Sequence, residues 1–152
     1  MPDISYGASL GVHLEYDTLL GPAPLSTLVR LRQRSGSQRG ALADIRLELG
    51  VYGKDTLGLQ TYLQATWANQ RAFMSDFGVA PEYAVHINTS AYLPAAGVRD
   101  LVLGLAGKID LNRKWMVVSA IERRQLRGAA ANSPIAEQSN SNILTLGTLY
   151  RF

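Results

Sequence analysis

Apolar and polar side chains alternate one for one along most of this chain. In residues 57–68 one set of alternate positions reads Leu, Leu, Thr, Leu, Ala, Trp, and the other set begins Gly, Gln, Tyr, Gln, Thr. A period of two residues is the signature of a β-strand, because successive side chains point to opposite faces of a sheet. The same period predicts seven strands, at residues 5–16, 25–34, 41–51, 57–68, 98–109, 114–126 and 141–152. The sequence therefore predicts an all-β chain with no convincing helix, apart from a short turn near residues 73–78.

The connections between the predicted strands alternate in length. Three are compact and rich in turn-forming residues, at 17–24, 52–56 and 110–113. Those between them are generally longer, at 35–40, 69–96 and 127–140. In an up-and-down sheet this places the short turns at one end and the long loops at the other. Such asymmetry is typical of bacterial outer-membrane barrels, with their short periplasmic turns and longer extracellular loops.

The polar face of the predicted strands is too charged to be the packed interior of a small soluble barrel. It carries Arg30, Arg32, Arg34, Asp44, Arg46, Glu48, Gln60, Gln64, Glu122 and Arg124. Charged side chains are rarely buried unless they are paired and hydrogen-bonded. A membrane barrel reverses the arrangement, with a polar lumen and an apolar face toward lipid. Because no apolar run approaches the ~18–20 residues of a spanning helix, we predict an antiparallel up-and-down transmembrane β-barrel.

Aromatic residues fall near the ends of the predicted strands. Tyr6 and Tyr16 bracket the apolar face of the first strand ten residues apart. That length is about 33 Å of strand, which a tilt of about 40° reduces to roughly 25 Å, the height of the apolar band between two aromatic girdles. Trp67 and Trp115 lie at the ends of their own strands. All four are therefore predicted to be membrane-interface aromatics.

The last predicted strand ends on an aromatic residue, Phe152, with Tyr150 two residues before it. This ending is similar to the carboxy-terminal signal by which the outer-membrane assembly machinery recognises its substrates, so both residues are predicted to form an assembly signal. If this end is periplasmic, seven strands place the other end outside the cell, whereas bacterial barrels normally have an even strand number. No signal peptide precedes the first strand. We therefore expect residues 1–152 to be the C-terminal portion of a single barrel domain of roughly twelve strands.

Three arginines spaced by two share the polar face of the second strand: Arg30, Arg32 and Arg34. One interpretation is an electropositive stripe that favours anionic solutes or lipopolysaccharide phosphates. The favoured interpretation is a lumen charge network, since paired charges need no solute. The acidic partners expected for the arginines are Asp44, Glu48 or Glu15.

The sequence does not assemble a catalytic site. The chain has no cysteine, which excludes thiol catalysis, disulfides and zinc–thiolate sites. His13 is predicted to line the lumen, and His86 lies in the long loop with Asp76 and Glu82. A metal site there lacks ligand spacing, and Ser133 has no adjacent base. We therefore predict no enzyme activity, no metal and no cofactor, and the absence of an aromatic platform beside the arginines argues against nucleic acid as a partner.

The second half of the chain carries a series of motifs in a specific order. Residues 65–79 contain Thr-Trp-Ala, an aromatic Met-containing segment and Phe-Gly-Val. Further along come Ala96-Gly97-Val98-Arg99-Asp100, Trp115, Ala131-Asn132-Ser133-Pro134-Ile135 and Tyr150-Arg151-Phe152. This series resembles the C-terminal region of the MipA/OmpV family, known as MltA-interacting proteins, and the first half fits that family's preceding strands more loosely. Residues 123–128 replace the usual Ser-Arg-Leu-Leu-Gly-Asp, and Asn132 stands where the family often has Asp.

The resemblance implies an outer-membrane barrel in a Gram-negative bacterium, in contact with outer-membrane lipid and lipopolysaccharide. The founding member of the family is a scaffold that brings a murein lytic transglycosylase together with a bifunctional penicillin-binding protein. The resemblance therefore implies a non-enzymatic scaffold for peptidoglycan-remodelling enzymes. The alternative is a small-solute pore, because a barrel of about a dozen strands is either plugged by side chains or leaves a narrow channel.

Overall fold

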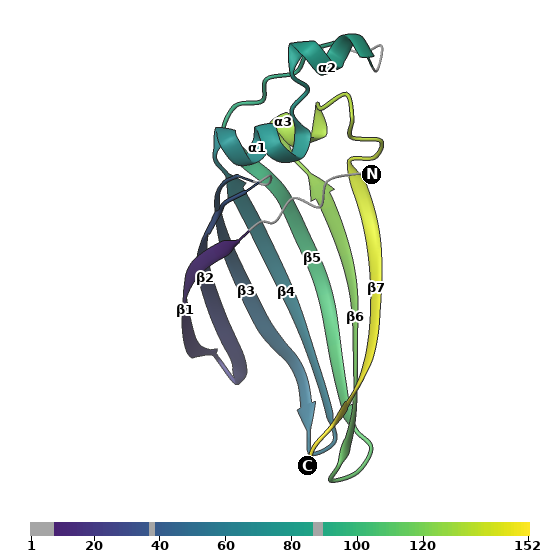
Figure 1. The fold of residues 1–152 in the computed structure, drawn as a ribbon. Coiled ribbons are helices and arrows are strands. Elements are labelled where there is room, and N and C mark those ends of the chain that lie inside the picture. The colour runs from purple at the N-terminus through teal and green to yellow at the C-terminus, as the bar shows by residue number, and fades with distance from the viewer. Residues whose placement is uncertain (1–7, 37–38, 87–89) are drawn as a thin grey trace.

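The computed structural model describes residues 8–36, 39–86 and 90–152. Seven antiparallel strands form one sheet in the order of the sequence (Figure 1). The strands are β1 (Ser9–Leu20), β2 (Ala23–Arg34), β3 (Gly40–Lys54), β4 (Leu57–Ala68), β5 (Gly97–Asp110), β6 (Trp115–Leu126) and β7 (Asn140–Tyr150). The predicted all-β class and the up-and-down antiparallel order are confirmed.

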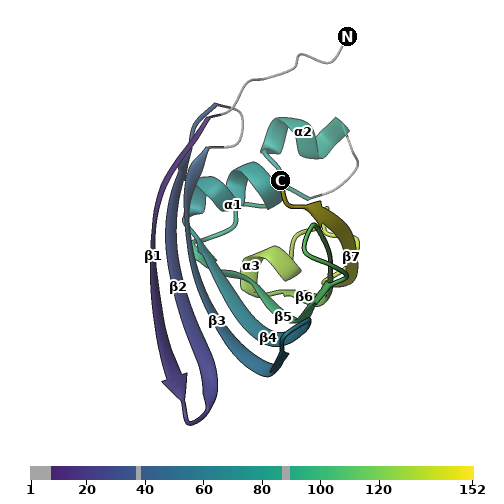
Figure 2. The same ribbon diagram turned by 90° about the horizontal axis from the view of Figure 1, so that it is seen from below.

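The sheet curves into an open trough (Figure 2). In the described part of the chain β1 and β7 are its two edges, each paired with one neighbour. Two helices, α1 (Gln70–Phe77) and α3 (Gly128–Ala131), lie on the concave side at one end, and α2 (Pro81–His86) lies beyond α1 (Figures 1 and 2). We call this the capped end. The short β1–β2, β3–β4 and β5–β6 connections lie at the opposite end, which we call the turn end.

The two faces of the sheet differ in chemistry. Leu42 and Ala68 pack in one buried cluster with α1, so the alternate positions in register with them form the concave face. That face includes Asp44, Thr66 and Asp100, all of them buried. The convex face leaves large hydrophobic side chains exposed, among them Val12, Leu14, Val29, Leu31, Ile45, Leu47, Leu63, Leu103, Leu105, Ile121, Leu144 and Leu146. The apolar face thus points out of the trough and the polar face points into it.

The turn after β1 is shorter than the sequence predicts. Residues 17–20 continue the strand, and Leu20 pairs with Ala23, so only Gly21 and Pro22 form the loop. Gly21 has φ 63°. A two-residue hairpin loop requires a positive φ, which glycine adopts without steric cost. The predicted 17–24 turn is therefore wrong at both ends.

β3 continues through a β-bulge past its predicted end at residue 51. Gly50 pairs with Gln60, whereas Tyr52 pairs with Leu59, so two residues of β3 stand opposite one of β4. The extra residue breaks the period of two on which the sequence prediction rests. The strand resumes after the bulge and continues to Lys54.

The short turn predicted near residues 73–78 overlaps α1, whereas α2 and α3 occupy segments that the sequence predicts to be loops, and that expectation is corrected. The Asn69 side chain caps α1 by accepting a 3.0 Å hydrogen bond from the Ala72 backbone N–H. Phe73 and Phe77, one turn apart, face the same side with ring centroids 6.1 Å apart. Eight residues are too few to display a helical period clearly. No helix in the described residues has the length and apolar character needed to cross a membrane.

The buried apolar core is small and lies at the capped end. It consists of Leu42, Ala68, Ala72, Phe73 and Ala130. Gly40, with φ 125°, lies so close to α1 that an added Cβ would stand 2.3 Å from the Ala72 nitrogen. The close approach of this glycine allows α1 to seat against β3.

Candidate functional site: a charge network beneath the helical cap

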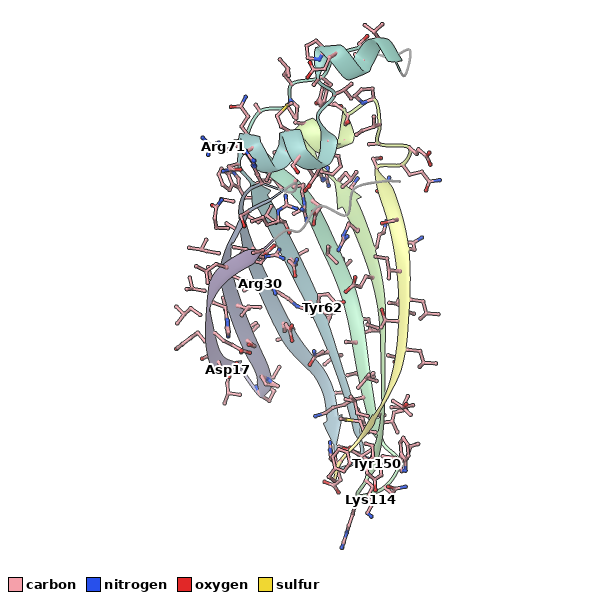
Figure 3. The ribbon with its side chains drawn as sticks, viewed as in Figure 1. Asp17, Arg30, Tyr62, Arg71, Lys114 and Tyr150 are labelled. Atoms are coloured by element: carbon pink, nitrogen blue, oxygen red, sulfur yellow. The ribbon has the colours of Figure 1, made fainter. Side chains whose placement is uncertain are left out.

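Asp44 is the centre of a charged cluster on the concave face. Its Oδ2 lies 3.1 Å from Arg30 Nε and 2.8 Å from Arg32 Nη2. Thr66 Oγ1 donates to its Oδ1 at 3.0 Å. The sheet register creates the cluster, because Arg30 and Thr66 are the direct cross-strand partners of Asp44. The buried carboxylate therefore has two cations and a hydroxyl around it (Figure 3 marks Arg30).

A second cluster ties α1 to the sheet. Asp76 Oδ2 accepts from Arg34 Nη2 at 2.9 Å and lies 3.5 Å from Arg99 Nη1. Arg99 Nε also contacts Asp100 Oδ2 at 2.6 Å. All four side chains are largely buried, with at most 18% of each exposed. Asp76 is thereby shared between two strands that lie far apart in the sequence.

A bulge on β5 gives Arg99 its place in this cluster. Thr66 pairs with Asp100 and Trp67 pairs with Val98, which leaves Arg99 as the extra residue. In a regular strand, Arg99 and Asp100 would point to opposite faces. A bulge re-aims one side chain, so both reach the concave side.

A third cluster lies nearer the turn end. Arg46 Nε contacts Glu48 Oε1 at 2.5 Å, and Gln60 Nε2 donates to Glu48 Oε2 at 3.0 Å. The Arg46 guanidinium also stacks 3.8 Å from the centre of the Tyr62 ring. Both polar and stacking contacts hold Arg46 along the floor of the trough.

Tyr62 crosses the trough floor to a distant strand (Figure 3). Its hydroxyl donates to Glu122 Oε1 on β6 at 2.5 Å. The ring passes directly over Gly104 of β5, where an added Cβ would stand 2.1 Å from Tyr62 Cζ. Glycine at this position is thus required by the contact between β4 and β6.

The predicted charge network can be compared residue by residue with these contacts. Arg30 and Arg32 both contact Asp44, whereas Arg34 contacts Asp76 instead. Glu48 is engaged by Arg46 and Gln60, not by the arginine row. Glu15 accepts a 3.1 Å hydrogen bond from Ser26 Oγ.

Sequence reasoning missed Asp76 and Arg99 as members of the network. Asp76 falls in the long connection, within the short turn predicted near residues 73–78, and its contact with the sheet depends on the whole of α1. Arg99 lies on a strand whose alternation assigns it to the wrong face. The one available signal was the four-residue spacing of Phe73 and Phe77, which is typical of one face of a helix. That spacing would have placed Asp76 on a helical turn.

The predicted interface aromatics lie at different places on the sheet. Trp115, Tyr150 and Phe152 form a row at the turn end, with ring centroids 5.0 Å and 5.3 Å apart (Figure 3 marks Tyr150). Trp67 is the next-to-last residue of β4 at the capped end and is 42% exposed. Tyr16 is exposed on the convex face of β1, four residues before that strand ends. Tyr6 lies outside the described residues.

Ser133, which the sequence raised as a candidate nucleophile, has a structural contact. Ser133 is buried and donates to the Phe77 carbonyl at 2.7 Å, which fixes the end of α1. Among the described side chains, no group of three His, Cys, Asp or Glu residues could hold a metal ion. The side chain of His86 is outside that described set.

The concave face is open at the turn end. A cavity of about 490 Å³ is lined there by small residues and a few polar ones, including Gly50, Gln60, Ala106, Lys108 and Ala120. A neighbouring cavity of about 510 Å³ includes Asp17, Ser26 and Glu48. The trough is therefore filled by the network and α1 at the capped end and hollow at the turn end.

Comparison with known proteins identifies the family. No curated protein and no solved structure gives a significant match to the chain. A family model described as MltA-interacting protein MipA matches residues 1–152. The ordered motifs at residues 65–79 and 96–100 and the sheet described above agree with this match. The chain therefore belongs to the MipA family.

Proposed function

We propose that the protein is a β-barrel of the Gram-negative outer membrane, with its convex face in lipid and its capped end toward the cell exterior. The exposed apolar convex face supports this location, as does the row of aromatic residues at the turn end. β1 and β7 run in the same direction, so antiparallel closure of the sheet requires an odd number of further strands. Five would give a barrel of about twelve strands, of which this sheet is the C-terminal part.

Within that barrel, we propose a non-enzymatic scaffold role for the protein in peptidoglycan remodelling. The observation that carries this proposal is the capped end, which is filled by ion pairs and by α1. Buried ion pairs and a packed helix make this part of the sheet rigid, as a scaffold requires. The family description names an interaction with MltA. We propose that a lytic transglycosylase and a penicillin-binding protein dock at the turn end, which would face the periplasm.

Co-purification tests the scaffold role. The full-length protein, extracted in mild detergent, is expected to retain the lytic transglycosylase, and separately the penicillin-binding protein. Charge reversal of the exposed turn residues Arg113 and Lys114 is expected to weaken retention. Reversal of Arg39 and Arg71 at the capped end changes the same number of charges and is the matched control. If folded parent protein retains neither enzyme, the partner assignment is wrong.

A small-solute pore is the second candidate, favoured by the hollow turn end with its cavities of about 490 and 510 Å³. Single-channel recording of the full-length protein separates the two functions. The scaffold reading predicts no steady openings, because α1 and the charged clusters occupy the trough. Steady, ion-selective openings would favour the pore.

We also propose that Tyr150 and Phe152 are read by the outer-membrane assembly machinery. Both aromatic rings are exposed beside each other at the turn end. Phe152→Ala is expected to reduce the amount of protein assembled in the membrane, whereas Phe152→Tyr retains it. Normal assembly of Phe152→Ala, measured by heat-modifiable migration, would contradict this role.

A further inference from the structure

A pocket at the capped end lies outside the charge network. It has a volume of about 640 Å³ and is lined by Arg39, Gln70, Arg71, Met74 and Ser75. Arg39 belongs to the connection between β2 and β3, and the other residues belong to α1. On α1, Arg71 and Ser75 lie on the side of the helix opposite Phe73 and Phe77, which face the core. The pocket therefore opens at the rim and not into the trough.

The pocket contains two arginines and no acidic residue. Among the described residues neither Arg39 nor Arg71 has a carboxylate within salt-bridge distance, and the first turn of α1 carries no acid. By contrast, Arg30, Arg32 and Arg34 on the concave face all contact carboxylates. The two arginines of the rim pocket thus differ from the row of arginines on the concave face, whose charges are balanced by carboxylates.

Arg39 makes a hydrogen bond within the β2–β3 connection. Its Nε donates to the carbonyl of Gly36 at 3.0 Å, in a turn where Gly36 has φ 88°. This contact uses Nε and not the two terminal amino groups of the guanidinium. Arg71 is exposed and lines the same pocket. Two guanidinium groups that line one pocket suit a phosphate, which accepts several charge-assisted hydrogen bonds.

The pocket lies close to the expected outer boundary of the membrane. Trp67, on the convex face of β4, is only four residues before Arg71. Tryptophan side chains concentrate at membrane interfaces, so Arg71 and Arg39 would stand at headgroup level or just above it. Figure 3 places Arg71 at the end of the molecule opposite Tyr150 and Lys114. In the proposed orientation, the anionic lipid at this level is lipopolysaccharide.

We propose that Arg39 and Arg71 form a binding site for the phosphate groups of lipopolysaccharide. The inference rests on the proposed outer-membrane location and adds a lipid ligand to it. The arginines supply charge and hydrogen bonds, and Met74 supplies an apolar contact at the same pocket. Binding of this kind anchors the capped end of the barrel in the outer leaflet.

The test compares two lipid probes and two double variants of the full-length protein in detergent. The probes are bisphosphorylated lipid A and dephosphorylated lipid A, with inorganic phosphate as a third arm. Arg39→Gln/Arg71→Gln removes the proposed site. Arg113→Gln/Lys114→Gln removes the same charge from the turn end and is the matched control. Heat-modifiable migration and outer-membrane fractionation of each variant measure folding and location separately from lipid binding.

The parent and the control are expected to bind bisphosphorylated lipid A about tenfold or more tightly than the dephosphorylated form, and the Arg39/Arg71 variant is expected to lose that preference. The site is overturned if a folded Arg39/Arg71 variant keeps the preference, or if the parent shows none. The second criterion holds even if the variant does not fold. If inorganic phosphate binds as tightly as lipid A, the site serves free phosphate and the lipid assignment is wrong. Fractionation of the parent away from the outer membrane would instead defeat the proposed location.

Discussion

The capped end and the turn end of the trough are made from the same seven strands but are filled differently. At the capped end, long charged side chains and α1 occupy the concave face, and Asp44 and Asp100 are buried. At the turn end the same face presents small residues such as Gly50, Ala106 and Ala120, and a cavity of about 490 Å³ remains. Both ends have the same alternation of apolar and polar residues. The size of the side chains on the concave face therefore decides which end of the trough is filled. This arrangement leaves the turn end accessible for a partner.

Removal of the central carboxylate is expected to have the largest effect on the capped end. Asp44→Ala leaves Arg30 and Arg32 without their shared anion and Thr66 without its acceptor. The free energy of unfolding is expected to fall by about 3 kcal/mol, at the low end for a buried ion pair because both arginines remain partly exposed. Denaturant titration in detergent measures this change.

Asp17→Ala is the matched control at the turn end. Asp17 is exposed, lines the open cavity and makes no ion pair among the described residues. A change within about 0.5 kcal/mol is expected. Equal losses for the two variants would remove the distinction between the ends.

Insertion of a methyl group between α1 and β3, by Gly40→Ala, is expected to have the next largest effect on stability. Gly40→Ala places a Cβ 2.3 Å from the Ala72 nitrogen, at a residue with φ 125°. Strain of this kind costs about 1–3 kcal/mol, and α1 is expected to lift from the sheet and become sensitive to protease. Gly53→Ala at the turn end, where nothing lies within 4 Å, is expected to have little effect. If α1 remains resistant to protease in Gly40→Ala, the contact between α1 and β3 is not close-packed.

Loss of the anion on α1 is expected to act locally. Asp76→Asn weakens the contacts to Arg34 and Arg99 but preserves the shape of the side chain. The expected cost is about 1–2 kcal/mol, measured as faster hydrogen exchange in residues 70–77 with unchanged exchange in β3 and β4. Uniform acceleration across the sheet would indicate that Asp76 supports the whole fold rather than the cap.

Filling the hollow end is expected to have the smallest effect. Ala120 faces the cavity of about 490 Å³, so Ala120→Leu has room for its added carbons. A change in unfolding free energy within about 0.5 kcal/mol is expected, measured by the same denaturant titration. A loss above about 1 kcal/mol would mean that the turn end is packed like the capped end.

The sequence was sufficient for the regular parts of the sheet and insufficient for its exceptions. Residues 57–68 were predicted with both ends correct, because unbroken alternation is flanked by turn-forming residues. The end of β3 and the orientation of Arg99 were missed, since a bulge adds one residue and reverses the alternation beyond it. Only a short turn was predicted where α1 forms, because the stability of the full helix comes from contacts with Leu42 and Ala130, which are distant in the sequence.

Within the arginine row, the partner of Arg30 and Arg32 could be predicted from the sequence, whereas the partner of Arg34 could not. Asp44 could be proposed as a partner for Arg30 and Arg32 because neighbouring antiparallel strands bring them together. The partner of Arg34 could not be found, because Asp76 reaches it only after α1 folds over the trough. Register between adjacent strands is a local property of the sequence, whereas the position of a cap is not.

The central claim is that the convex face meets lipid and the concave face meets water or protein. The chain has no cysteine, so single cysteines can be introduced at Leu63 on the convex face and Gln64 on the concave face of β4 and spin-labelled. In the full-length protein in bilayers, collision rates with oxygen are expected to be high at 63, and collision rates with an aqueous nickel complex are expected to be higher at 64 than at 63. This two-residue alternation is expected to continue along residues 57–68. The reverse preference, or no alternation, would contradict the account.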